Sequence, residues 1–424
     1  MNREALVRIF DLDEEGAGLG WKEGRQFHVW GALPGELVRA RVTGKRKGRF
    51  FAVAEEILEP SPRRTTPLED HFLSCSPWQI LDIGSELELK RERVERLLSS
   101  ALGRRVEVDI SQSPQIFGYR NKMEFSFLRE RISLAFFQRG RRGKVELTKG
   151  CALAHPAINA TSLRICSLLR ESGIPASSLK SMVVRSNSNG ETLAALFLRD
   201  KLERVPSFDV SAVSRLLGLR VFYSDPRSPA SVITEELFDA GRSQLEEEVL
   251  GRKFLFSETC FFQVNLPAFE EALRDMLNFT SGADILYDFY AGVGTIGISS
   301  GAKRVVLVES DMEATRWAVQ NAELNNVSGF EVILERAEDF ISSAQEGSVF
   351  VFDPPRTGLH KKVLASLLEK EPARIVYLSC NPYTQARDLE AISHRYRPVF
   401  IRSYNFFPNT PHVECLVVMD RKAS

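Results

Sequence analysis

Short runs of alternating apolar and polar residues fill the beginning of the chain. The runs VRIF, FHVW, LVRARV and FFAVAEEI stand between turns that contain glycine or proline. A period of two is typical of short antiparallel strands with one buried face, so the pattern predicts a small β-barrel over residues 1–60. The segment EPSPRRTTPLED at 59–70 has three prolines and little apolar content, which predicts a linker or a surface segment.

The pattern changes twice after this linker. Residues 71–250 combine a helix-like run near 84–101 with the strand-like runs EFSFL and SLAFFQ at 124–138, which predicts a central α+β domain. Over residues 251–424, apolar strand runs alternate with amphipathic helical runs. This alternation predicts an α/β domain with a doubly wound, mainly parallel sheet. Its strand runs are ILYDFY, RVVLVE, VFVFDPP, IVYLSC, FIRSYNFF and CLVVMDR.

Composition narrows the class of protein. The 56 basic and 56 acidic residues cancel, so any affinity for nucleic acid has to come from local patches. The six cysteines are scattered and include no CxxC pair, which favours reduced thiols. There is no leader-like start and no run of 18 apolar residues. We therefore expect a cytoplasmic protein with no membrane association, and nothing in the sequence indicates an obligate protein partner.

A glycine turn follows the first strand of the C-terminal domain. The strand ILYDFY continues into a turn with Gly292 and Gly294 and then into the helical run IGISSGA. Glu309 ends the next strand, at a spacing that suits an acidic side chain binding ribose hydroxyls. A glycine turn is also common without any ligand, but here the third glycine of a dinucleotide fingerprint is missing. With Asp353 at the end of the fourth strand, the pattern favours methyl transfer over hydride transfer.

Two further residues suit methylation of a pyrimidine carbon. Carbon 5 of uracil is a poor nucleophile unless a thiolate first adds to carbon 6, and a base must later remove the carbon 5 proton. Cys380 follows the strand run IVYL, at the end where parallel sheets bind ligands, and Glu414 precedes CLVVMDR. Each of these residues also has a purely structural alternative. Cys380 could be a small apolar residue that ends a strand, and Asp353 could cap a helix. Glu414 could be a solvated charge at the edge of the sheet.

Five motifs together resemble the family of bacterial RNA (uracil-5-)-methyltransferases, which modify transfer and ribosomal RNA. The resemblance implies a Rossmann-like S-adenosylmethionine-dependent methyltransferase domain with Cys380 as nucleophile and Glu414 as base. It also implies cofactor contacts, besides those of the glycine turn, from Gln263, Tyr290, Glu309 and Asp353. The motifs are SETCFFQVN at 257–265, DFYAGVGTIG at 288–297, FDPPRTGLH at 352–360, LSCNPYTQARDL at 378–389 and FPNTPHVE at 407–414.

The N-terminal part resembles the RNA-binding barrel called TRAM, through GAGLGW at 16–21 and GALPGELVRARV at 31–42. Its basic stretch, which includes Arg46 and Lys47, could contact phosphates. Arg120 and Lys122, in a stretch similar to the family's YRNK strand, are further candidates for binding RNA. A member with this barrel favours 23S ribosomal RNA as substrate, with the T-loop of transfer RNA as the alternative. The oligomeric state stays open.

Many members of the family carry four cysteines that bind an iron–sulfur cluster. Only Cys75 and Cys151 match those positions here, and His71 as a further ligand would still leave the set one short. We therefore expect no cluster and no metal, with packing around Phe72 and Trp78 in its structural role. A bridge between Cys75 and Cys151 stays open.

Three alternatives compete with this hypothesis. A nitrogen methyltransferase would not need Cys380, and it would usually have an aromatic residue where Arg356 follows the two prolines. An RNA-binding protein with an inactive methyltransferase domain would not need the intact Cys380 and Glu414. A DNA cytosine methyltransferase would place its cysteine in another motif, after the fourth strand.

Overall fold

The computed structural model describes residues 4–202, 209–228 and 230–423. They form two compact units, each assembled from separate stretches of the chain. Unit 1 comprises Met1–Glu86, Gln115–Ser243 and Phe407–Pro411, and unit 2 comprises Leu87–Pro114, Gln244–Phe406 and His412–Ser424. The division into three continuous domains expected from the sequence stays a prediction.

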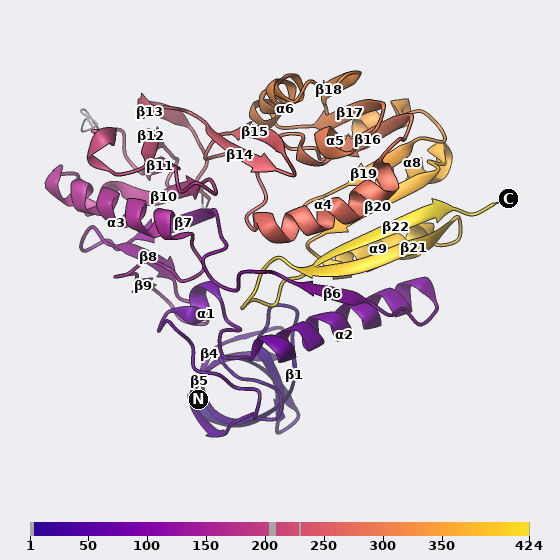
Figure 1. Ribbon diagram of the computed structural model, residues 1–424. Coiled ribbons are helices and arrows are strands. Elements are labelled where there is room, and N and C mark those ends of the chain that lie inside the picture. The colour runs from indigo at the N-terminus through magenta and orange to yellow at the C-terminus, as the bar shows by residue number, and fades with distance from the viewer. Residues whose placement is uncertain (1–3, 203–208, 229, 424) are drawn as a thin grey trace. The chain divides into compact units, whose positions relative to one another are not determined.

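Unit 1 begins with a closed five-stranded barrel in the order β1-β2-β3-β5-β4 (Figure 1). In β1 every second side chain is buried, and Ala5, Val7 and Ile9 pack into the barrel core. The predicted small β-barrel is therefore confirmed. Its strands are β1 (Glu4–Leu12), β2 (Gly18–Lys22), β3 (Arg25–Trp30), β4 (Leu37–Arg46) and β5 (Arg49–Glu59).

The rest of unit 1 is a seven-stranded sheet in the order β13-β12-β11-β10-β7-β8-β9. Helix α3 (Pro156–Glu171) packs on it through Ile158, Ile165 and Leu169. The one-turn helix α1 (Phe72–Cys75) contacts β8. The strands are β7 (Lys122–Phe127), β8 (Leu134–Phe137), β9 (Lys144–Glu146), β10 (Leu179–Ser186), β11 (Thr192–Leu198), β12 (Leu216–Tyr223) and β13 (Glu235–Gly241).

Unit 2 contains an eight-stranded sheet in the order β18-β17-β16-β19-β20-β22-β21-β6. The first five strands are parallel, and β22 runs antiparallel to both of its neighbours. The strands are β6 (Asp109–Gln112), β16 (Ile285–Phe289), β17 (Arg304–Glu309), β18 (Phe330–Leu334), β19 (Val349–Phe352), β20 (Arg374–Ser379), β21 (Tyr396–Asn405) and β22 (Glu414–Arg421). The helices are α2 (Ile83–Leu102, which begins in unit 1), α4 (Leu266–Thr280), α5 (Thr295–Ser299), α6 (Met312–Leu324), α7 (Ala337–Phe340), α8 (Lys361–Lys370) and α9 (Pro382–Ile392).

This mixed sheet confirms the predicted α/β fold class. The hairpin of β14 (Leu245–Val249) and β15 (Arg252–Phe256) precedes the parallel strands of this sheet in the chain. The carboxyl ends of the five parallel strands lie along one edge of the sheet, and because β22 is antiparallel, its first residue lies at that edge too. The strand order therefore places Cys380, which follows the parallel strand β20, at the same sheet edge as Glu414, which begins the antiparallel strand β22.

No helix in the described part of the chain combines the length and the apolar character needed to cross a membrane.

Candidate active site

The glycine turn after β16 is held by the acidic residue that ends β17. Gly292 N–H donates a hydrogen bond of 2.9 Å to Glu309 Oε2, and Glu309 Oε1 accepts from the backbone of Ser310 and Asp311. Tyr290, Gly292 and Gly294 all have positive φ, at 64°, 55° and 87°. The left-handed conformation is costly for the non-glycine Tyr290, and such strain is common at ligand-binding turns.

A second carboxyl group, that of the buried Asp288, stabilises the helix that follows the turn. Asp288 is 1% exposed and accepts a 2.8 Å hydrogen bond from Gly297 N–H. Burial raises the pKa of Asp288 from 3.8 to about 8, although the hydrogen bond from Gly297 opposes the shift. A Cβ on Gly297 would lie 2.3 Å from Leu307 Cδ2 and 3.0 Å from Asp288 Oδ2. Glycine is therefore required where α5 packs against β16 and β17.

A pocket of about 660 Å³ opens beside this turn. Tyr290 and Glu309 line it, together with Glu335 and Arg336 after β18 and the segment 357–361 after β19. Its volume suits a nucleoside-sized ligand. Sequence reasoning missed Glu335 and Arg336, although their place at the carboxyl end of the third parallel strand could have indicated them.

Gln263 and Asp353 are hydrogen-bonded to each other at the carboxyl end of β19. Gln263 Nε2 donates a 3.1 Å hydrogen bond to Asp353 Oδ2, across 90 residues of sequence. Burial raises the pKa of Asp353 to about 7, and the hydrogen bond from Gln263 opposes this shift. Neither residue lines the pocket. Asp353 directly follows β19, and Cys380 directly follows the neighbouring strand β20. Gln263 and Asp353 therefore lie at the same sheet edge as Cys380.

Cys380 and Glu414 are neighbours across two strands. The pairing of β20 with β22 runs to Ser379 opposite Cys415, and the next position in that register is Cys380 opposite Glu414. Glu414 is 2% exposed, and its Oε2 has no hydrogen-bond partner among the described residues. Burial, followed by the charge of Asp353, raises its pKa well above the ordinary value. An isolated buried carboxyl group of this kind is a candidate general base.

The Cys380 thiol shares this environment and is half-buried. Burial raises its pKa to about 12, with smaller contributions from Glu414 and Asp353, whereas the positive charge of Arg356 lowers it. Arg356 is in turn 2.6 Å from His412 Nδ1. Asn381, beside the thiol, caps α9 by accepting from Tyr383 N–H and donates 2.8 Å to the carbonyl of Arg356.

The four candidate RNA-binding residues belong to unit 1. Arg46 and Lys47 are exposed at the turn between β4 and β5. Arg120 and Lys122 are half-buried around the start of β7, and the Arg120 backbone bonds to Leu153 and His155. Their role in binding RNA stays a prediction.

Comparison with known proteins decides the family. The model of the tRNA (uracil-5-)-methyltransferase family matches residues 83–422, which is most of the chain. This chain belongs to that family. Membership confirms the expected class of enzyme, an S-adenosylmethionine-dependent RNA (uracil-5-)-methyltransferase, over the nitrogen- and DNA-methylating alternatives. The TRAM assignment of the barrel stays a prediction.

Relatives match over nearly the whole chain. An uncharacterized RNA methyltransferase of Caldanaerobacter subterraneus subsp. tengcongensis is 30% identical over 441 residues, covering 98% of each chain. One from Clostridium tetani is 28% identical, over 99% of this chain and 98% of its own. Among solved structures, the tRNA (uracil-54, C5)-methyltransferase of Pyrococcus abyssi, in complex with S-adenosyl-L-homocysteine, is 26% identical with a TM-score of 0.78 and covers 98% of this chain and 100% of its own.

Proposed function

We propose that this enzyme methylates carbon 5 of a specific uridine in RNA through a covalent bond between Cys380 and carbon 6, and that Glu414 removes the proton from carbon 5. The observation that carries the proposal is the adjacent placement of Cys380 and the buried Glu414 in the register of β20 and β22. A thiol nucleophile and a base held on two paired strands match the two chemical demands of this reaction.

The glycine turn and its pocket fit S-adenosylmethionine. A Cβ on Gly292 would meet no atom within 4 Å, so the backbone is open to a ligand there. Glu309 and Tyr290 line the pocket and would hold the adenosine part, and Gln263 and Asp353, which are hydrogen-bonded to each other, would hold the part nearer Cys380. When bound, S-adenosylmethionine supplies an electrophilic methyl group on a sulfonium.

The protein's own residues carry the remaining steps. The Cys380 thiol releases its proton to solvent and its sulfur bonds to carbon 6, so the electrons of the carbon 5–carbon 6 double bond move toward carbon 5, which then accepts the methyl group. Glu414, as a carboxylate, takes the carbon 5 proton. The electron pair re-forms the double bond, and the carbon 6–sulfur bond breaks to free the Cys380 thiolate. Arg356, which lowers the pKa of the Cys380 thiol, favours the thiolate.

The favoured substrate is 23S ribosomal RNA in the cytoplasm. The barrel supports this choice, because its exposed Arg46 and Lys47 offer a surface that can bind phosphates. Arg120 and Lys122 would add contacts to an unpaired loop. A uridine of the tRNA T-loop is the second candidate, which the similarity to the tRNA-methylating enzyme of Pyrococcus abyssi favours.

Nucleoside mass spectrometry tests the activity and the target together. Full-length protein is incubated with S-adenosylmethionine and either unmodified 23S ribosomal RNA or transfer RNA, and fragment mapping locates 5-methyluridine. Cys380→Ala is the test variant. Cys166→Ser, which changes a buried cysteine of α3 in unit 1, is the matched control.

We expect 5-methyluridine in 23S RNA with the wild type and with Cys166→Ser, and none with Cys380→Ala. Methylation of transfer RNA alone would replace the favoured substrate with the second candidate. Methylation by Cys380→Ala would refute the thiolate mechanism.

A further inference from the structure

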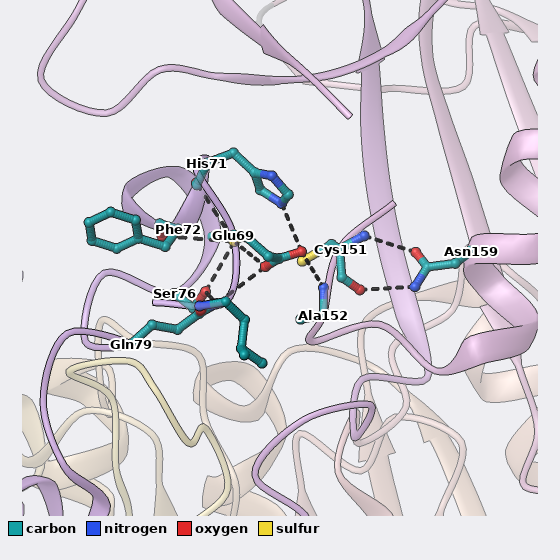
Figure 2. Close-up of polar contacts among 10 residues, drawn as sticks. Glu69, His71, Phe72, Ser76, Gln79, Cys151, Ala152 and Asn159 are labelled. Carbon is teal, nitrogen blue, oxygen red and sulfur yellow. Dashed lines mark hydrogen bonds and ion pairs between the residues drawn. The ribbon is translucent and has the colours of Figure 1, made fainter. Parts of the chain in front are cut away.

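Four side chains that can bind metal converge in unit 1. Glu69, His71 and Cys75 lie in and just before α1, and Cys151 lies in the loop before α3. One ligand atom from each lies within 4.8 Å of every other. Figure 2 shows Glu69, His71 and Cys151 directed toward a common centre. The methylation mechanism uses none of them.

The spacing of the ligand atoms suits a single ion. His71 Nε2 is 3.1 Å from Glu69 Oε1, and Cys75 Sγ is 3.9 Å from Glu69 Oε2. Ligand atoms around one tetrahedral zinc ion are separated by about 3.3–3.8 Å, from zinc–ligand lengths of about 2.0–2.3 Å. Only a small contraction of the group would place all four at bonding distance.

The same spacing argues against an iron–sulfur cluster. A cluster inserts several iron and sulfide atoms between its ligands, which holds the ligand atoms farther apart than around one ion. Such clusters also use four thiolates as a rule, and this group contains two, from Cys75 and Cys151. Two sulfurs, an imidazole and a carboxylate are instead a donor set that zinc accepts.

The histidine nitrogen is available to a metal. His71 Nε2 is buried and lies 3.1 Å from Glu69 Oε1, a member of the same group. Because this contact lies within the group, a metal ion at the centre would replace it without breaking a contact elsewhere.

Neighbouring residues form hydrogen bonds with Glu69 and Cys151. Ala152 N–H donates 2.6 Å to Glu69 Oε1, and Gln79 Nε2 donates 3.2 Å to Glu69 Oε2. Asn159 makes two 3.0 Å hydrogen bonds with the backbone of Cys151. Such outer contacts orient the ligands and are typical of built metal sites.

We propose that Glu69, His71, Cys75 and Cys151 bind one zinc ion. In the bound form both thiols and His71 have released their protons to solvent, and two thiolates, one carboxylate and a neutral imidazole bring the net charge of the ion and its ligands to −1. The four protein ligands complete a tetrahedron and leave no open position, so the site is structural. It ties the segment around α1 to the loop before α3. The expectation of no metal was based on thiols and one histidine and did not consider Glu69.

Metal analysis of the untagged full-length protein tests the proposal. Zinc is measured by mass spectrometry after reconstitution with zinc chloride and gel filtration, for the wild type, Cys151→Ser, Glu69→Gln and the control Cys166→Ser. We expect about one zinc per chain in the wild type and in the control. Loss of a ligand should lower the affinity for zinc at least about tenfold, because loss of an outer contact alone costs that much.

Cobalt(II) provides a readout that does not depend on the folding of a variant. Wild-type protein loaded with cobalt should show the visible bands of a tetrahedral ion and a near-ultraviolet band from thiolate ligands. A wild type that binds neither zinc nor cobalt would overturn the proposal, as would iron with acid-labile sulfide in the purified protein, or a disulfide between Cys75 and Cys151.

Discussion

Cys380 and Glu414 occupy facing positions one step beyond the last backbone pair of β20 and β22. Cys380 directly follows β20 and Glu414 begins β22, so neighbouring strands of one sheet fix the separation of the two residues more firmly than two loops would. The proximity has an electrostatic consequence, because the charge of Glu414 raises the pKa of the Cys380 thiol. The proposed nucleophile and base are thus electrostatically coupled before any substrate binds.

Replacing the base should trap the reaction after methyl transfer. Glu414→Gln keeps the size of the side chain but cannot accept a proton, so we expect turnover to fall by about 10²–10⁴-fold. A covalent protein–RNA band should accumulate on a denaturing gel. Glu331→Gln, an exposed glutamate of β18 paired with Arg304, is the control and should behave as wild type. Fast turnover by Glu414→Gln would assign the base elsewhere.

The reactivity of Cys380 should rise steeply with pH. Because its pKa is about 12, the thiolate fraction in the free protein should increase about tenfold per pH unit between pH 7 and 9. Iodoacetamide labelling, followed by peptide mass spectrometry, measures it. Arg356→Gln removes the positive charge that lowers this pKa, so labelling should be slower at each pH. A plateau below pH 8 would contradict the high pKa.

Asp288 should make the enzyme less stable as the pH rises. Its pKa is about 8 in the folded protein and near 3.8 when unfolded, so folding favours the protonated form. The stability that this provides is complete below about pH 4 and is lost as the pH rises toward 8. Asp288→Asn should therefore gain in unfolding midpoint over the wild type, by a few degrees, between pH 5 and pH 8. An equal difference at both pH values would refute this.

A methyl group at Gly297 should disturb the cofactor turn. The Cβ would overlap Leu307 and press on Asp288, and we expect a loss of about 1–3 kcal/mol in stability, with weaker S-adenosylmethionine binding by calorimetry. Gly84→Ala in α2 is the matched control, because its Cβ would meet only Asp82 at 3.4 Å. That substitution should be neutral or slightly stabilising. If Gly297→Ala and Gly84→Ala changed stability and cofactor binding equally, the steric explanation would be wrong.

The barrel should contribute to RNA affinity through charge alone. Arg46→Ala combined with Lys47→Ala should weaken binding and lower the slope of log affinity against log salt by about 1.4, at about 0.7 per phosphate contact. Arg39→Ala in the same barrel is the control, because Arg39 is paired with Glu56. Filter binding over a salt series measures the slope, and an unchanged slope would exclude these contacts.

The sequence predicted those parts of the fold that follow from local pattern. Alternation in residues such as Ala5, Val7 and Ile9 indicated the barrel, and the runs ending at Glu309 and Asp353 indicated the α/β sheet. Cys380 and Glu414 could be named from their chemistry. Their facing register could not, because it depends on β22 returning antiparallel beside β20.

The less predictable features arise from contacts between distant segments. Glu69 was not recognised beside Cys151, because a carboxylate is a common surface residue and the two are 82 positions apart. The raised pKa of Asp288 comes from burial, which periodicity alone does not measure. The bond from Gln263 to Asp353 likewise requires the folded strand edge.

The short strand β6 pairs with β21 through Asp109 and Arg402, which are 293 residues apart. During synthesis, Asp109–Gln112 leaves the ribosome long before its partner exists, so this edge of the sheet in unit 2 stays open until β21 has been made. Termination after α9 would leave this segment without its neighbour β21, and the proposed nucleophile Cys380 without β22. Under the proposed mechanism, the chain therefore becomes active only after β22 has been made.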